Sequence, residues 1–191
     1  MAASQDSPIT GPFPFEADRL LQFLVTLGIS ATTHQHPPVF TVEESQAIRG
    51  LLPGGHCKNL LLRDRKHRLW LLVCRENLTL DLKSLRAPLG AISSLSFASP
   101  EVLREVLGVT PGAVTPFGLI NDRARRVTPV IDTALLTYQT LYFHPLRNDR
   151  STAISPQDLK DFIAACGHTP LELDLEEVPA KRVEIPHAPP R

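Results

Sequence analysis

The stretch from His56 to Leu62 constrains the fold of this chain most, because it reads as a strand that begins polar and becomes fully apolar. A strand turns alternate side chains to opposite faces, so Lys58 and Leu60 share one face and Asn59 lies on the other. Burial disfavours the charged form of a lysine, so Lys58 needs either a partner or a chemical task. The alternative is that Lys58 lies at the mouth of the strand and extends its ammonium into water.

The composition is typical of a single soluble domain. The chain has 191 residues, of which 42% are hydrophobic, and this is enough to build a core. Twenty basic residues balance twenty acidic ones, so an RNA partner would have to meet a local basic patch. No apolar run approaches the length of a membrane span, and the N-terminus lacks the layout of a signal peptide. We therefore expect a cytoplasmic protein with neither a membrane nor a DNA partner.

The cysteines and histidines indicate neither disulfides nor a metal site. Cys57, Cys74 and Cys166 are an odd number at long spacing, without a paired CxxC motif, as expected for reduced thiols. His34 and His36 share a strand face, but no third ligand lies near them in the sequence. We therefore expect no metal and no cofactor. A nucleophilic Cys57 and a Ser-His-Asp triad both stay open, although free cysteines are more often small buried hydrophobes and no GxSxG motif is present.

Helix and strand signals are mixed along the chain without regular βαβ alternation. Helices are predicted over residues 16–27, 41–51, 78–85, 99–108 and 155–166. Strands are predicted over residues 29–36, 93–97, 117–120, 127–131, 140–143, 151–154 and 171–175, with a β-hairpin over 57–73. The second helix begins with a capping box formed by Thr41 and Glu44. This pattern predicts an α/β (mixed α+β) fold around a mixed sheet.

Two polar segments could converge on Lys58. The loop from Gly108 to Gly118 is rich in glycine and proline and could present backbone N–H groups to an anion or a carbonyl, or could simply connect two elements. The segment from His144 to Asn148 follows a predicted strand, and its histidine could equally be an ordinary loop residue. Together the three would suit binding of an ester carbonyl or a phosphate and activation of water against it.

These motifs, in this order, resemble the YbaK/ProX family of aminoacyl-tRNA deacylases, and most of all its free-standing PrdX or ProXp-ala branch. The matching segments are His36-Pro37, Thr41–Glu44, Cys57–Leu62, Gly108–Gly118 and Phe143–Leu146 with Asn148. The resemblance extends over residues 16–175. The Lys-Asn-Leu-Leu-Leu run and the Val-Thr-Pro-Phe-Gly loop are specific mainly in combination.

The resemblance implies a single-domain fold with a curved mixed β-sheet flanked by helices. It implies an editing domain over residues 15–175. The Ser, Pro and Gly residues without periodicity over 1–14 predict a flexible N-terminal arm, and the prolines and charges over 176–191 predict a C-terminal tail. The implied activity is trans-editing, in which the ester of mischarged Ala-tRNA(Pro) is hydrolysed without a metal or cofactor. The implied partners are the acceptor end of tRNA(Pro) and prolyl-tRNA synthetase.

The resemblance also implies roles for individual residues. Lys58 matches the lysine that the family needs for activity. Substrate contacts are implied for Asn59, Gly112, Thr115, Phe117, Gly118, Phe143, His144 and Asn148. Phe143 replaces the methionine of related members, so the size of the pocket is expected to differ. We expect Arg123, Arg125 and Arg126 to contact the tRNA.

Two other functions fit the same residues. One is a deacylase for a different mischarged tRNA, such as Cys-tRNA(Pro). The other is a tRNA-binding or synthetase-associated module without catalysis. Editing is needed because a synthetase pocket for proline cannot strongly reject the smaller alanine. Each methylene that a ligand lacks changes its binding free energy by only about 1–3 kcal/mol. A second, smaller pocket can instead admit alanine and exclude proline by steric clash.

Overall fold

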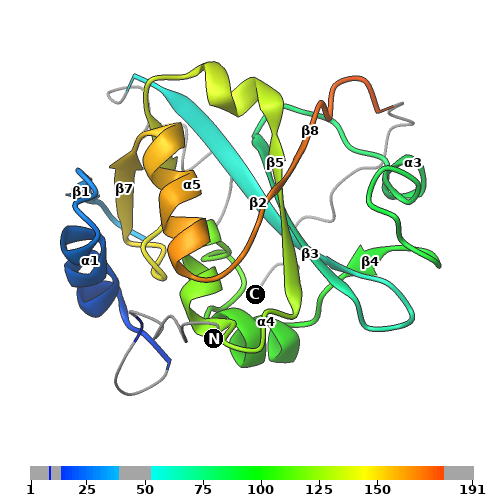
Figure 1. Ribbon diagram of the computed structural model, residues 1–191, viewed down its shortest axis with the longest axis horizontal. Helices are drawn as coiled ribbons and strands as arrows, with labels where there is room; N and C mark the ends of the chain where they lie inside the picture. The colour runs from blue at the N-terminus through cyan, green and yellow to red at the C-terminus, as the bar shows by residue number, and fades with distance from the viewer. Residues whose placement is uncertain (1–8, 10–13, 39–52, 179–191) are drawn as a thin grey trace, which may run out of the picture.

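The fold is an eight-stranded mixed sheet with helices packed on it (Figure 1). The computed structural model describes residues 9, 14–38 and 53–178. Across the sheet the strands run β1-β7-β6-β2-β3-β5-β8, and the short β4 pairs with β2. The pairs β2–β6, β3–β5 and β5–β8 are parallel, whereas the others are antiparallel. The predicted mixed α/β fold is confirmed.

The element bounds are close to those predicted from the sequence. The strands are β1 Thr32–Gln35, β2 Gly55–Arg63, β3 Leu69–Arg75, β4 Ser96–Phe97, β5 Val127–Asp132, β6 Leu141–Phe143, β7 Arg150–Ile154 and β8 Leu171–Leu173. The helices are α1 Ala17–Thr26, α3 Leu82–Leu85, α4 Pro100–Leu107 and α5 Pro156–Ala165, with 3₁₀ helices η1 Pro116–Asn121 and η2 Thr133–Thr137. The predicted capping box at Thr41 and Glu44 lies outside the described residues.

Strand β2 joins two half-sheets. On one side it forms the predicted hairpin with β3, paired from Cys57–Arg75 to Arg63–Leu69. On the other side it meets β6 through only two residue pairs, Gly55–Leu141 and His56–Tyr142. A Cβ atom at Gly55 would lie 2.7 Å from Cδ2 of Leu141, so only glycine allows the two strands to approach this closely.

The two faces of the sheet carry separate hydrophobic cores. Helices α1, α4, α5 and η1 cover one face, where Leu61, Phe117 and Phe162 are buried. The other face buries Leu62 and Trp70 beneath α3 and its flanking loops. Leu61 and Leu62 are neighbours in sequence but belong to different cores, as strand alternation requires.

Two predicted elements were wrong. Residues 117–120 were expected to form a strand but belong to the 3₁₀ helix η1, where Thr115 Oγ1 accepts a hydrogen bond from the Phe117 N–H at 3.3 Å. A short buried apolar run looks the same in a strand and in a helical turn, so hydrophobicity cannot separate them. The helix expected from residue 78 begins only at Leu82, because Asp81 caps it by accepting from the Lys83 N–H at 3.1 Å.

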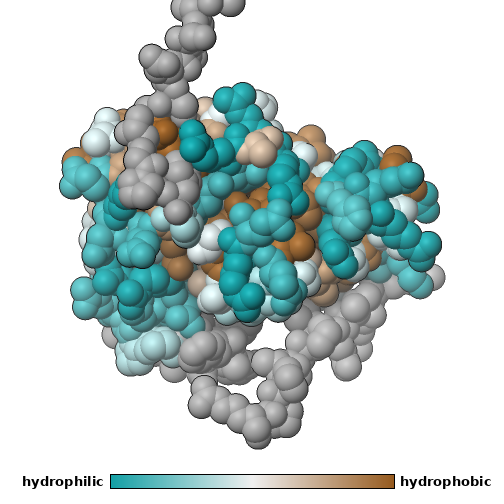
Figure 2. Space-filling view, turned by 90° about the horizontal axis from the view of Figure 1, so that it is seen from below, coloured by the Kyte–Doolittle hydropathy of each residue, from teal (hydrophilic) through white to brown (hydrophobic). Residues whose placement is uncertain are grey.

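The coloured surface seen from below is mainly polar, with hydrophobic residues visible between the polar ones (Figure 2). Among the described residues, no helix is both long and apolar enough to cross a membrane.

A buried histidine should make the stability of the fold depend on pH. His168 is 6% exposed, its Nδ1 lies 3.1 Å from the Val127 carbonyl, and its Nε2 lies 3.8 Å from Asp122 Oδ2. Burial lowers the pKa of His168 below its ordinary value, although Asp122 acts in the opposite direction. The unfolded chain therefore takes up this proton first, and stability should fall as the pH drops below about 6.5.

Urea unfolding at several pH values between 7.5 and 5.5 tests this expectation. His168→Gln should reduce the slope of unfolding free energy against pH, whereas His67→Asn, a change at an exposed histidine on the hairpin tip, should leave it unchanged. An unaltered slope in His168→Gln would show that the acid sensitivity arises elsewhere.

Candidate functional site

Lys58 lies on the face of the sheet that carries the smaller core. Its Cα lies opposite that of the buried Cys74 on β3, and its Nζ donates a hydrogen bond to the carbonyl oxygen of Leu78. Burial lowers the pKa of the Lys58 ammonium below its ordinary value. The ammonium is therefore held by one loop carbonyl in a partly desolvated position, where a charge interacts more strongly than it does in water.

A cavity of about 220 Å³ opens beside Lys58. Leu60 comes from the same strand, while the following loop and α3 provide most of the remaining wall. The lining residues are Lys58, Leu60, Glu76, Asn77, Leu78, Thr79, Leu80, Leu82 and Phe97. The cavity combines one cation, one carboxylate and two further polar residues with apolar walls made of four leucines and Phe97.

Rings from three strands lie on the same face as Lys58. His56 stacks on Tyr142 with ring centroids 5.6 Å apart and an interplanar angle of 18°, and His34 lies 6.5 Å beyond Tyr142. His36 and His144 form a further ring pair at 6.0 Å. The structure therefore places His144 on the Lys58 face, as one member of a cluster of four histidines and a tyrosine.

The glycine-rich loop meets the opposite face. Asn59 Nδ2 donates to the Val114 carbonyl at 3.1 Å, and within the described part of the chain its buried Oδ1 accepts no hydrogen bond. Thr115 and Phe117 are fully buried. A Cβ atom at Gly118 would lie 2.9 Å from Leu107 Cβ, so this glycine allows η1 to pack on α4. The loop and Lys58 therefore do not converge in this structure.

The remaining expected substrate contacts are dispersed. Phe143 is 2% exposed and packs edge-to-face on Phe117, with ring centroids 6.0 Å apart, in the larger core. Gly112 occupies an exposed turn with a φ of 86°, where glycine is favoured. Asn148 is half-buried in the loop between β6 and β7. The roles expected for these three residues remain predictions.

The cysteines are poorly suited to nucleophilic catalysis. Cys57 faces away from Lys58, toward the larger core, and its Sγ lies 3.7 Å from the Gly55 carbonyl. Burial raises the pKa of the Cys74 thiol to about 12, so it stays protonated at neutral pH. Burial likewise raises the pKa of Cys166.

The three arginines proposed to bind tRNA share one exposed turn between η1 and β5. Arg126 pairs with Glu105, and Arg125 adopts a φ of 53° with its guanidinium against Gly167. Because Val127 pairs with Leu69, this turn lies at the hairpin-tip end of the sheet. Lys58 lies five residues along β2 from that end, a distance of about 17 Å, or roughly five phosphate spacings on one nucleic-acid strand.

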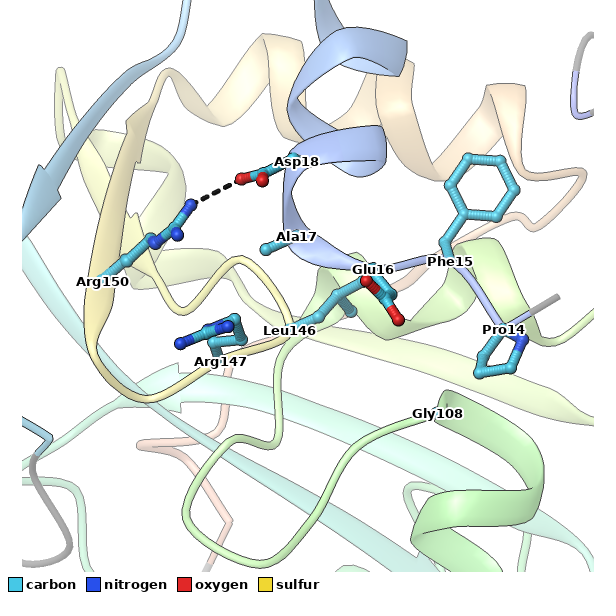
Figure 3. A pocket seen from close by; sticks show the side chains of 9 residues that line it. All are labelled: Pro14, Phe15, Glu16, Ala17, Asp18, Gly108, Leu146, Arg147 and Arg150. Carbon is cyan, nitrogen blue, oxygen red and sulfur yellow. Dashed lines mark hydrogen bonds and ion pairs between the residues drawn. The ribbon is translucent and has the colours of Figure 1, made fainter. Parts of the chain in front are cut away.

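A second cavity, of about 350 Å³, lies where the start of α1 meets the loop before β7 (Figure 3). Each of its arginines is paired with a carboxylate: Arg150 Nη1 lies 2.7 Å from Oδ1 of Asp18, and Arg147 Nη2 lies 2.5 Å from Oδ2 of Asp149, which does not line the cavity. Lys58, by contrast, donates to a neutral carbonyl, so its cavity is the better candidate for a reaction site. Among the described residues, no cluster of three or more His, Cys, Asp or Glu side chains could hold a metal ion.

Sequence reasoning missed the cavity walls. Leu78, Leu80 and Phe97 looked like ordinary core residues, and only the long-range packing of their loops brings them to Lys58. Strand alternation could have placed His56 beside Lys58, since the two are separated by one residue on β2.

Comparison with known proteins gives consistent results. The family described as aminoacyl-tRNA editing domain matches residues 36–162. A prolyl-tRNA synthetase associated domain-containing protein 1 from Danio rerio is 38% identical over 82% of this chain and 86% of its own. The prolyl-tRNA editing protein ProX of Acetoanaerobium sticklandii is also 38% identical, over 75% and 87% of the two chains.

A solved structure shares the fold. The crystal structure of a candidate trans-editing enzyme for prolyl tRNA synthetase aligns with a TM-score of 0.64 and 23% identity, covering 86% of this chain and 99% of that one. With the match over residues 36–162 and relatives 38% identical, this chain belongs to the aminoacyl-tRNA editing domain family.

Proposed function

We propose that this protein is a trans-editing deacylase that hydrolyses the ester of mischarged Ala-tRNA(Pro), with Lys58 as its catalytic residue. The observation that carries the proposal is the ammonium of Lys58 in the wall of a small, mainly aliphatic cavity. Membership of an aminoacyl-tRNA editing family supports the reaction class, and the relative described as a prolyl-tRNA editing protein supports proline tRNA.

The reaction is an ester hydrolysis that needs only water. Water attacks the carbonyl carbon, the bond from that carbon to the ribose oxygen breaks, and one proton of the water passes to the ribose oxygen. The products are a free amino acid and an intact tRNA 3′ end. Negative charge develops on the carbonyl oxygen in the transition state, and the desolvated Lys58 ammonium would stabilise it there.

Release of amino acid from Ala-, Cys- and Pro-tRNA(Pro) tests the proposal. We expect the wild-type protein to release alanine much faster than proline. Faster release of cysteine would instead identify the alternative deacylase. Turnover of none of the three, with tRNA binding retained, would indicate a binding module.

Contact with tRNA through Arg123, Arg125 and Arg126 forms part of the proposal, because all three lie on one exposed turn. Three phosphate contacts predict that log KM rises with log salt concentration with a slope of about 2–3. Replacing all three with alanine should flatten this dependence, whereas Arg147→Ala, at the other edge of the sheet, should not. A slope above about 6 would contradict so small a patch.

Prolyl-tRNA synthetase is the second proposed partner, and relatives described as associated with that synthetase support it. The neutral net charge of the chain fits the same arrangement, because a weak intrinsic affinity for tRNA is offset when a synthetase delivers the substrate.

A further inference from the structure

We infer that the cavity beside Lys58 is the pocket that holds the amino-acid part of the substrate, and that Leu80 and Phe97 set the largest side chain it accepts. This inference rests on the proposed function and assigns the selection of amino acid to the loops that precede and follow α3. Phe143, which the family resemblance connects with the size of the pocket, lies on the other face of the sheet.

The size of the cavity matches a small ligand. Pockets for drug-sized ligands occupy about 300–1,000 Å³, whereas this one measures about 220 Å³. Each water molecule occupies about 30 Å³ in the liquid, so the cavity has the volume of roughly seven water molecules. This is room for a small aminoacyl group with the edge of its sugar, and too little for the nucleotide as well.

The polar groups of the cavity match the two ends of an amino-acid ester. Lys58 provides a cation for the ester carbonyl. Glu76 follows β3 and lines the same cavity as Lys58, so its side chain lies on the Lys58 face. A carboxylate accepts several hydrogen bonds at once, and the α-ammonium of an aminoacyl ester is a complementary cation. Uncharged acyl esters lack this second contact.

The apolar walls match a short aliphatic side chain. Leu78 and Leu80 come from the loop after β3, Leu82 comes from α3, and Phe97 comes from β4, where its backbone pairs with Leu62. Phe97 is 41% exposed, although it is a large aromatic residue on a strand of only two residues. An aromatic ring at the rim of a small cavity blocks bulky groups while it contributes little to the core.

Phe97 is therefore the residue of choice for a test, since truncating an exposed side chain leaves the two cores intact. Phe97→Ala and Leu80→Ala should each widen the cavity and raise the ratio of kcat/KM for Pro-tRNA(Pro) to that for Ala-tRNA(Pro) by about 10-fold or more. Ile92→Ala removes another exposed hydrophobic residue, which does not line the cavity, and should leave the ratio unchanged. Thermal unfolding of each variant confirms that it is folded.

Phe143→Leu separates this inference from the expectation based on the family resemblance. Phe143 is 2% exposed on the opposite face, so its replacement should lower stability and leave the ratio unchanged. If Phe143→Leu changes the ratio and Phe97→Ala does not, the pocket lies on the other face and the inference is wrong, while the proposed function stands. If the wild-type protein releases no amino acid, the proposed function fails and the inference fails with it.

Discussion

Lys58→Ala is expected to lower kcat/KM for hydrolysis of Ala-tRNA(Pro) by about 10²–10³-fold, the usual effect of removing one group that stabilises a developing oxyanion. The variant should stay folded, because within the described part of the chain the hydrogen bond that the ammonium loses is one to the loop carbonyl of Leu78. Single-turnover release of alanine, measured beside thermal unfolding, separates loss of chemistry from loss of structure.

Lys83→Ala provides the matched control, because Lys83 is an exposed lysine on the neighbouring helix α3 and does not line the cavity. Lys58→Arg keeps the charge but changes its shape, so it should restore only part of the rate. If Lys58→Ala hydrolyses Ala-tRNA(Pro) at the wild-type rate, Lys58 has no role in the reaction. If the wild-type protein binds tRNA but has no turnover, and Lys58→Ala changes only tRNA binding, the protein is a binding module without catalysis.

Arg75→Leu should produce the largest loss of stability among changes outside the two cores. Arg75 Nε lies 3.1 Å from Oδ2 of Asp132, a carboxylate that is fully buried at the end of β5. Removing the arginine leaves this charge with the backbone N–H of Ala134 as its remaining donor among the described residues. Breaking a buried ion pair in this way typically costs about 3–5 kcal/mol. For a chain of this size that lowers Tm by about 6–20 °C.

A second, exposed contact of Arg75 provides the control. Arg75 Nη2 lies 2.9 Å from Oε2 of Glu176, whose side chain is 70% exposed. Glu176→Ala removes only this exposed contact and should cost less than about 1 kcal/mol. Equal losses in Arg75→Leu and Glu176→Ala would show that the buried carboxylate does not dominate. Differential scanning calorimetry of both variants decides the question.

Local sequence patterns predicted most of the fold because the signals for its elements are local. The β2–β3 hairpin follows from two apolar runs around a polar tip, and α4 and α5 each begin with a Ser-Pro pair at the expected position. Residues 117–120 were misassigned because burial on all sides removes the periodicity that distinguishes a strand from a helical turn. The helix predicted over residues 78–85 begins only at Leu82, because the local pattern did not identify Asp81 as its cap.

The candidate site could be predicted only in part. Alternation on β2 correctly separated Lys58 from Asn59, but it gave no information about what covers either face. The cavity walls come from residues 76–97, which reach Lys58 through tertiary packing, and their leucines are indistinguishable in the sequence from other core leucines. His144 was expected near Lys58, and the structure does place it on that face, whereas the glycine-rich loop lies on the other.

The narrow contact between β2 and β6 has a consequence for what holds the two half-sheets together. Two residue pairs connect the half-sheet that carries the histidine cluster to the half-sheet that carries the cavity. One of these residues, His56, is separated from Lys58 by a single position along the same rigid strand. The larger core continues across this junction, because Leu61 of β2 lies in the same buried cluster as Leu141 and Phe143 of β6. Side-chain packing in that core, and not strand pairing alone, therefore holds the two half-sheets together.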